Sequence, residues 1–207
     1  KSCLSSGQVV ALRELHRGPH TPAAGSISCP FPSATGVAGS ACRGMRLGSA
    51  QTGVANSADA TLGLGMLRQF QLTPPDPQFD PWQRVDWDRL LRRVAATAAI
   101  GDADNPFLST FALRAKLITY NGLSDQGLAS SELVNWYQQA QAATGPAAAD
   151  AMRLYLVPGM THCGGGEATD KFEMLDAIVD WVEHGRAPGS MLANTSSGPP
   201  LSRPLCP

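Results

Sequence analysis

Two short apolar runs, each followed by a helical pattern, constrain the fold of this chain more than any other feature. The runs lie at 116–120 and 152–157, and the helical patterns lie at 129–143 and 170–184. Strands that are apolar along most of their length and alternate with helices are typical of a parallel sheet with helices on its faces. The second half of the chain is therefore predicted to have an α/β fold.

The last helical pattern carries its own start and stop signals. Asp170 and Glu173 stand in the positions of a cap and the third helical residue, and Gly185 follows the pattern. His184 lies at the helix end, where a positive charge is favourable, and needs no other role. We expect a set of apolar side chains to face the core from this helix: Phe172, Leu175, Ile178, Val179 and Val182.

The first half of the chain is less regular. Ser5 and Gln8 form a capping box, which predicts a helix over 6–17 that ends at Gly18. Residues 19–65 are rich in Gly, Ala, Ser, Thr and Pro, and we expect an irregular, loop-rich region there. Further helical patterns predict helices at 58–70 and 86–98.

The loop after the second apolar run reads P-G-M-T-H-C-G-G-G and combines a histidine with three glycines. His162 is thus predicted to lie at the edge of the sheet, where the glycines allow another segment to approach closely. Asp125 follows the earlier strand, in the turn N-G-L-S-D. Functional groups gather beyond the carboxyl ends of strands in open α/β sheets, so Asp125 and His162 can meet there as an acid–base pair.

A nucleophile to accompany this pair is not visible. Acid followed by histidine is the chain order of α/β hydrolases, which carry an earlier serine in a G-x-S-x-G elbow. No serine of the chain lies in that motif, and Ser124 has Gln126 where the second glycine would stand. Taken singly, Asp125 is also typical of a turn residue, and His162 of a structural histidine.

Composition argues against several classes of function. Sixteen lysines and arginines stand against 17 acidic residues, without a basic cluster, which argues against nucleic-acid binding. No apolar run approaches the roughly 20 residues that a membrane span needs. A zinc site at His162 and Cys163 is an alternative, although adjacent residues rarely bind one tetrahedral metal ion and no second ligand pair is apparent.

The cysteines indicate an oxidising compartment. Their number is odd and their spacing gives no C-x-x-C motif: Cys3, Cys29, Cys42, Cys163 and Cys206. We expect a secreted or periplasmic protein in which Cys29 and Cys42 form a bridge, while other cysteines have partners outside this chain. Buried free thiols in a cytosolic protein are the alternative.

Three stretches of the chain carry a family resemblance. V-P-G-M-T-H-C-G-G-G, with the following G-E-A-T-D-K-F-E-M-L-D-A-I-V-D-W-V-E-H-G-R-A-P, resembles the C-terminal signature of the tannase and feruloyl esterase family. K-L-I-T-Y-N-G-L-S-D-Q resembles the strand that carries the acid in that family, with Asn121 in place of a more usual histidine. C-L-S-S-G-Q-V-V-A-L-R-E-L-H-R-G-P resembles a helix of the family's lid.

This resemblance implies an α/β fold that is the C-terminal half of an α/β-hydrolase, with part of an inserted irregular lid domain. Residues 1–105 would form the partial lid, and residues 106–207 the C-terminal part of the catalytic domain. Asp125 would be the acid of a catalytic triad and His162 its general base, and Leu128 would line the substrate site. Cys163 resembles the cysteine that forms a disulfide beside the nucleophilic serine.

The remaining parts of such an enzyme would lie upstream of Lys1. They include the serine, its neighbouring cysteine, the oxyanion-hole donors and the calcium loop of the family's lid, so we expect no cofactor and no metal site in this chain itself. The expected partners are the N-terminal half of the same enzyme and a small aromatic ester, and no nucleic acid or membrane. The expected function is hydrolysis of esters of phenolic or aromatic acids, and the chain alone is expected to be inactive. A catalytically silent binding module is the alternative.

Overall fold

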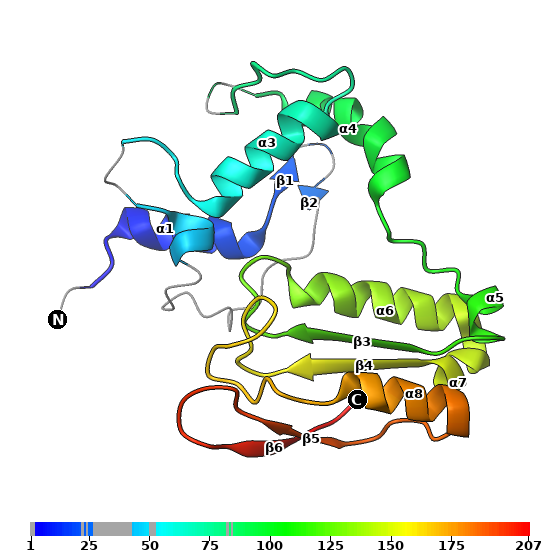
Figure 1. The fold of residues 1–207 in the computed structure, drawn as a ribbon. Helices are drawn as coiled ribbons and strands as arrows, with labels where there is room; N and C mark the ends of the chain where they lie inside the picture. Colours follow the sequence, from blue (N-terminus) through cyan, green and yellow to red (C-terminus); the bar gives the residue numbers. More distant parts are fainter. Residues whose placement is uncertain are drawn as a thin grey trace. The chain divides into compact units, whose positions relative to one another are not determined.

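The computed structural model describes residues 3–21, 23, 25–26, 43–49, 53–81, 83 and 85–207. The chain divides into two units, of which the first ends at Ala103 and the second includes Asp104–Pro207 (Figure 1). Cys29 and Cys42 lie outside the described residues, and so does their predicted bridge. That the first unit is part of a lid stays a prediction.

The first unit begins with the predicted capped helix. Helix α1, Ser6–Arg17, has Ser5 as its N-cap. The Gln8 amide N–H donates to Ser5 Oγ at 3.3 Å, and the Ser5 amide donates to Gln8 Oε1 at 2.8 Å. The capping box is therefore confirmed. Two short strands, β1 (His20–Thr21) and β2 (Gly25–Ser26), pair antiparallel after it.

The rest of the first unit is helical. Helical structure with alternating α and π hydrogen bonding runs through η2 (Asp59–Gly63), α3 (Leu64–Met66) and η3 (Leu67–Gln71), which confirms the helix predicted at 58–70. A π-helical turn, η1 (Arg43–Leu47), lies within the region that was expected to be irregular. The expectation was wrong for this segment. Helix α4, Trp87–Gly101, is capped by Asp86 and ends three residues later than predicted.

A parallel pair of strands organises the second unit. After the short helix α5 (Ser109–Ala112), strand β3 (Leu117–Gly122) pairs with β4 (Met152–Val157), as predicted. Between them lie α6 (Ser130–Thr144), η4 (Gly145–Ala147) and α7 (Ala148–Ala151). The turn expected at 121–125 begins later, at Leu123, because Asn121 and Gly122 continue β3 and Gly122 pairs with Val157.

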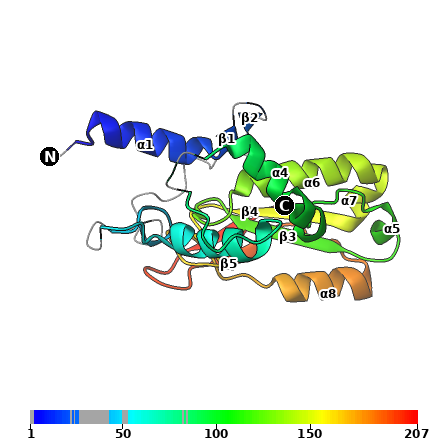
Figure 2. The same cartoon turned by 90° about the horizontal axis from the view of Figure 1, so that it is seen from above.

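Two clusters of buried side chains lie on the two faces of this strand pair. Met152 packs on the α6 side, in a cluster with Tyr137, Ala140, Ala148 and Ala151. Tyr155 and Val157 face the other way, into a cluster with Met160, Ala168, Ala193 and Leu205. Figure 2 shows α6 and the last helix, α8 (Met174–His184), on opposite sides of the strands. The layered α/β arrangement follows from this alternation of side chains along β4.

Helix α8 differs from the sequence prediction in its start. It begins at Met174, after Glu173, rather than near Asp170. Lys171 is held in extended structure, because its N–H and C=O each bond to Asn194 at 2.9 Å. The carboxylate of Asp170 accepts hydrogen bonds from other segments and does not cap the helix.

The buried face of α8 is also rotated relative to the prediction. Trp181 is 3% exposed, whereas Leu175, Val179 and Val182 are 73%, 41% and 58% exposed. The partly buried residues Met174, Ala177 and Ile178 lie on the same side of the helix as Trp181. The expectation that Leu175, Val179 and Val182 face inward is therefore wrong. Phe172 contacts the core, but from the segment before the helix.

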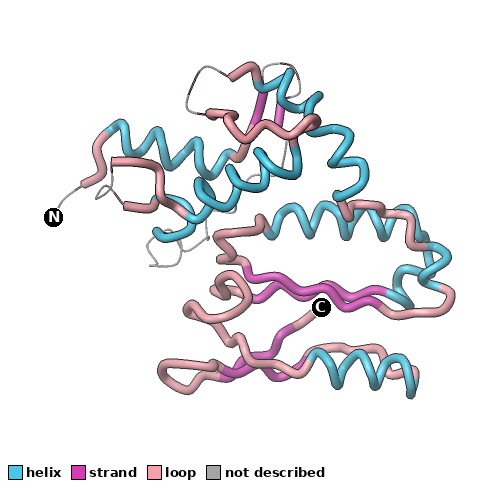
Figure 3. Tube along the Cα trace, turned by 45° about the horizontal axis from the view of Figure 1, so that its top comes forward, coloured by secondary structure: helices cyan, strands magenta, loops and turns pink. Residues whose placement is uncertain are grey.

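A C-terminal hairpin was missed in the sequence. Strands β5 (Met191–Asn194) and β6 (Ser202–Leu205) pair antiparallel and are visible in Figure 3 as the second magenta pair of this unit. Pro204 stands within β6 opposite Leu192, and a proline inside a run argues against a strand in sequence-based reasoning. None of the helices in the described part of the chain has the length and apolar character needed to cross a membrane.

Candidate active site

The acid of the predicted pair lies in the loop of residues 123–128, which we call the acid loop and which is buried at its centre. Ser124, Asp125 and Gln126 are 8%, 4% and 7% exposed. Asp125 Oδ1 accepts hydrogen bonds from the backbone N–H groups of Gly127 at 2.7 Å and Leu128 at 2.9 Å. The acid loop therefore fixes its own carboxylate through bonds within a few residues.

The structure brings the two predicted site residues together. His162 Nδ1 lies 3.1 Å from Asp125 Oδ2 and 3.2 Å from Oδ1. The Asp125 side chain is 5% exposed, whereas the imidazole is 38% exposed. A carboxylate that accepts the Nδ1 proton fixes the tautomer, so that Nε2 is left to accept or donate a proton. This geometry suits a general base.

The segment that carries the histidine, residues 158–166, has an unusual backbone; we call it the histidine loop. Cys163, Gly164, Gly165 and Gly166 have φ values of 61°, 144°, 72° and 81°. Glycine adopts such values without steric cost, whereas the left-handed conformation is uncommon for cysteine. The three glycines thus allow the tight turn that follows His162.

Direct contacts join the two loops. Gln126 Oε1 accepts a hydrogen bond from the His162 backbone N–H at 3.2 Å, and the Ser124 N–H donates to the Met160 carbonyl at 3.0 Å. A Cβ on Gly122 would overlap that same carbonyl group, so only glycine fits there. The bond from Gln126 was not predicted, because the sequence does not show which side chain faces the histidine loop.

The other predicted site residues lie at the surface. Leu128 is 62% exposed and follows the acid by three residues. Among the described cysteines, Cys3, Cys163 and Cys206 are exposed free thiols. Within the part of the chain that the structure describes, no three His, Cys, Asp or Glu side chains are grouped as metal ligands. His184 pairs with Asp180 at 3.1 Å on α8.

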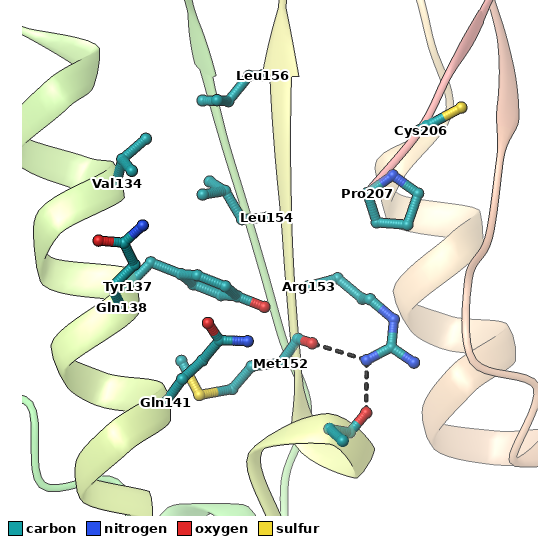
Figure 4. Close-up of a pocket in the computed structure, with 11 residues that line it drawn as sticks. Val134, Tyr137, Gln138, Gln141, Met152, Arg153, Leu154, Leu156, Cys206 and Pro207 are labelled. Atoms are coloured by element: carbon teal, nitrogen blue, oxygen red, sulfur yellow. Dashed lines mark hydrogen bonds between the residues drawn. The ribbon is translucent and has the colours of Figure 1, made fainter.

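A separate pocket of about 720 Å³ lies along β4 (Figure 4). Its walls come from α6, α7, β4 and the C-terminal residues and contain neither residue of the acid–base pair. Tyr137 faces it, and burial raises the pKa of that phenol. The guanidinium of Arg153 donates to the carbonyl oxygens of Ala149 at 2.5 Å and Met152 at 2.8 Å. Arg153 therefore stabilises the turn between α7 and β4.

Comparison with known proteins identifies the family. The sequence matches the family model described as tannase and feruloyl esterase over residues 1–207. The chain belongs to this family. It is 33% identical over 238 residues to mono(2-hydroxyethyl) terephthalate hydrolase of Piscinibacter sakaiensis, covering 99% of the chain and 38% of that enzyme. It is 24% identical to a probable feruloyl esterase of Arthroderma benhamiae, covering 93% of the chain and 36% of that protein.

Solved structures show the same fold. An esterase from Aspergillus oryzae superposes with a TM-score of 0.71 at 19% identity, over 99% of the chain and 42% of the esterase. A tannin acyl hydrolase from Aspergillus niger gives a TM-score of 0.68 at 17% identity, over 98% and 39% of the respective chains. The chain thus spans less than half the length of the relatives it matches.

Proposed function

We propose that this member of the tannase and feruloyl esterase family supplies the acid and the general base of a Ser-Asp-His ester hydrolase. The contact of His162 with Asp125 at the ends of adjacent parallel strands carries this proposal. It unites a buried carboxylate with a half-exposed imidazole, the arrangement that activates a serine.

In the proposed reaction, His162 Nε2 takes the proton from the serine hydroxyl as its oxygen attacks the ester carbonyl. The imidazolium then protonates the departing alcohol, which leaves an acyl-enzyme. Nε2 next takes a proton from water as the water oxygen attacks the acyl carbon, and it returns that proton to the serine as the acid departs. Asp125 holds the Nδ1–H throughout and stabilises the imidazolium.

We further propose that the nucleophilic serine comes from polypeptide outside these 207 residues. No G-x-S-x-G motif occurs in the chain, and the relatives are more than twice its length. Cys163 is an exposed thiol beside His162, a position suited to a disulfide with a cysteine near that serine. Such a bridge is consistent with a secreted or periplasmic protein.

The proposed substrates are esters of phenolic or other aromatic acids. The names of the relatives specify terephthalate, feruloyl and tannin esters, whose acyl groups are aromatic. Leu128 is an exposed apolar side chain three residues from the acid and is proposed to contact the aromatic ring.

Hydrolysis of methyl ferulate tests this function. The 207-residue chain is compared with a polypeptide that also includes the sequence preceding Lys1 in its gene. We expect no turnover by the chain alone and turnover by the longer polypeptide. Turnover by the purified chain that disappears in a His162→Ala variant would overturn the proposal that the serine lies outside. An inactive longer polypeptide that is folded would instead favour a binding module.

A further inference from the structure

Local contacts close the histidine loop, including a β-bridge between Met160 and Gly166 and a bond from Thr161 Oγ1 to the Gly164 carbonyl oxygen at 2.5 Å. Four consecutive residues have positive φ, and three of them are glycines, which lose the most backbone freedom on folding. Its internal hydrogen bonds are local, such as those of the Thr161 N–H to the Gly165 carbonyl at 3.3 Å and of the Gly164 N–H to the Thr161 carbonyl at 3.2 Å. A loop this rich in glycine gains further order from contacts with other segments.

Asp170 makes contacts of that kind. Its Oδ2 accepts hydrogen bonds from the Gly165 backbone N–H at 2.7 Å and from Ser196 Oγ at 2.7 Å. Its Oδ1 accepts from the Ser196 backbone N–H at 2.9 Å. Hydrogen bonds to a charged acceptor are stronger than those between neutral groups. One carboxylate therefore joins the turn after His162 to the turn after β5.

The segment after Asp170 and the β5–β6 hairpin are themselves ordered by backbone hydrogen bonds. Residue 171 forms a β-bridge with Asn194, the last residue of β5, with two N–H···O bonds of 2.9 Å. The Thr195 N–H donates to the Leu201 carbonyl at 3.0 Å and closes the β5–β6 turn. Asp170 thus precedes a residue that is already paired with the hairpin. Its hydrogen bonds join this ordered segment to the histidine loop.

The charge state of Asp170 also suits an anchor. The Ser196 hydroxyl, together with the backbone N–H bonds, lowers the pKa of this carboxyl from 3.8 to about 2. Asp170 therefore stays ionised over the whole range in which histidines titrate. It does not exchange protons during a reaction cycle near neutral pH, and its effect on His162 is one of position.

We propose that Asp170 is a positioning residue that holds the histidine loop against the β5–β6 hairpin and so keeps the His162 ring on Asp125. Its importance for catalysis rests on the proposed function, because a base displaced by about 1 Å loses on the order of a hundredfold in rate. The geometric effect on the His162–Asp125 contact does not depend on any ester or serine.

Proton NMR of the 207-residue chain tests this role. A ring N–H bonded to a carboxylate gives a low-field signal, which disappears when the contact opens and water exchanges the proton. His162→Gln identifies that signal. We expect Asp170→Ala to remove it and to speed deuterium exchange of the Gly165 amide by about tenfold or more. Asp170→Asn has the same size but cannot accept all three bonds, and we expect a smaller change in the same direction.

Two further variants make the result specific. Ser196→Ala removes one donor on the hairpin and is expected to speed Gly165 exchange less than Asp170→Asn does. Asp180→Asn is the matched control, because the pKa of this carboxyl is also lowered, by a bond from Arg186, but it lies on α8 away from the loop. It should leave the His162 signal unchanged.

The outcomes separate this proposal from the proposed function. An Asp170→Asn variant that is folded by circular dichroism, with the low-field signal and the Gly165 exchange rate unchanged, overturns the positioning role. So does the absence of a low-field His162 signal from the unsubstituted chain. If Asp170→Ala unfolds, Asp170→Asn and Ser196→Ala decide the question. Because no hydrolysis is measured, an inactive enzyme leaves these results intact.

Discussion

The acid loop and the histidine loop meet at one edge of the sheet but are held there differently. Asp125 is 4% exposed and accepts bonds from the two residues that follow Gln126. His162 stands before a run of positive φ, and its ring is 38% exposed. Its loop has local bonds of its own, and further contacts come from other segments, through Gln126 and Asp170.

The two loops therefore have different roles in forming the acid–base pair. A buried acid that is fixed by neighbouring backbone groups provides a hydrogen-bond acceptor for the imidazole in one fixed position. A glycine-rich loop can place the base close to that point, but it depends on partners that are distant in sequence. Substitutions in the acid loop should therefore act on the acid–base pair directly, whereas substitutions around the histidine loop should act through position and stability.

The largest effect is expected from Asp125→Asn. The amide oxygen can still accept the backbone N–H bonds, but the side chain no longer stabilises the His162 tautomer and imidazolium. We expect kcat for methyl ferulate in the longer polypeptide to fall by about 10⁴-fold, with the protein still folded. A loss of less than about tenfold would remove Asp125 from the proposed triad.

Gly122→Ala should have the next largest effect, through the stability of the fold beside the pair. The added Cβ overlaps the Met160 carbonyl group, where the end of β3 approaches the histidine loop closely. We expect a loss of about 1–3 kcal/mol in the free energy of unfolding, measured by urea denaturation. Gly189→Ala is the matched control, because nothing lies within 4 Å of the added atom. Equal stability of the two variants would contradict the close approach.

The lowered pKa of Asp170 predicts that the stability of the folded chain depends on pH. Its pKa is lowered in the folded state, from 3.8 to about 2, so its contribution is present above the ordinary value and is lost as pH falls through about 2. The unsubstituted chain should be more stable than Asp170→Asn near neutral pH, by on the order of 1 kcal/mol. Urea unfolding at successive pH values should show the gap closing between about pH 5 and pH 2. A gap that is independent of pH would refute the anchoring bonds.

The smallest effect on stability is expected at Leu128. Its side chain is 62% exposed, so Leu128→Ala should change the free energy of unfolding by less than about 0.5 kcal/mol. If it contacts the aromatic acyl group, KM for methyl ferulate should rise while kcat for a small aliphatic ester stays the same. A variant with unchanged KM for both esters would show that Leu128 does not line the substrate site.

The residues that sequence reasoning found are those with local signals. His162 and Asp125 each follow an apolar strand, and the order of strands and helices placed both at one edge of a parallel sheet. Asp170 does not cap α8 as predicted, because an acidic residue three positions before Glu173 only imitates a helix cap. Its actual partner, Ser196, lies 26 residues away.

Non-local pairing also explains the other errors. Strand β6 contains Pro204 and is ordered by pairing with β5, which no local pattern reveals. Trp181 marks the buried face of α8. The apolar residues on the exposed face of this helix have the same helical spacing, so the sequence pattern does not distinguish the two faces. Gln126 could not be identified because a single glutamine gives no signal for a bond to the backbone of residue 162.

Covalent labelling of the nucleophile tests the central claim most directly. The longer polypeptide is treated with diisopropyl fluorophosphate, and the modified peptide is identified by mass spectrometry. We expect one modified serine that precedes Lys1, with no labelling in the His162→Ala variant, because the serine then lacks its base. A modified serine within residues 1–207, or labelling that persists without His162, would contradict the proposal that this chain provides the acid and the base for a serine outside it.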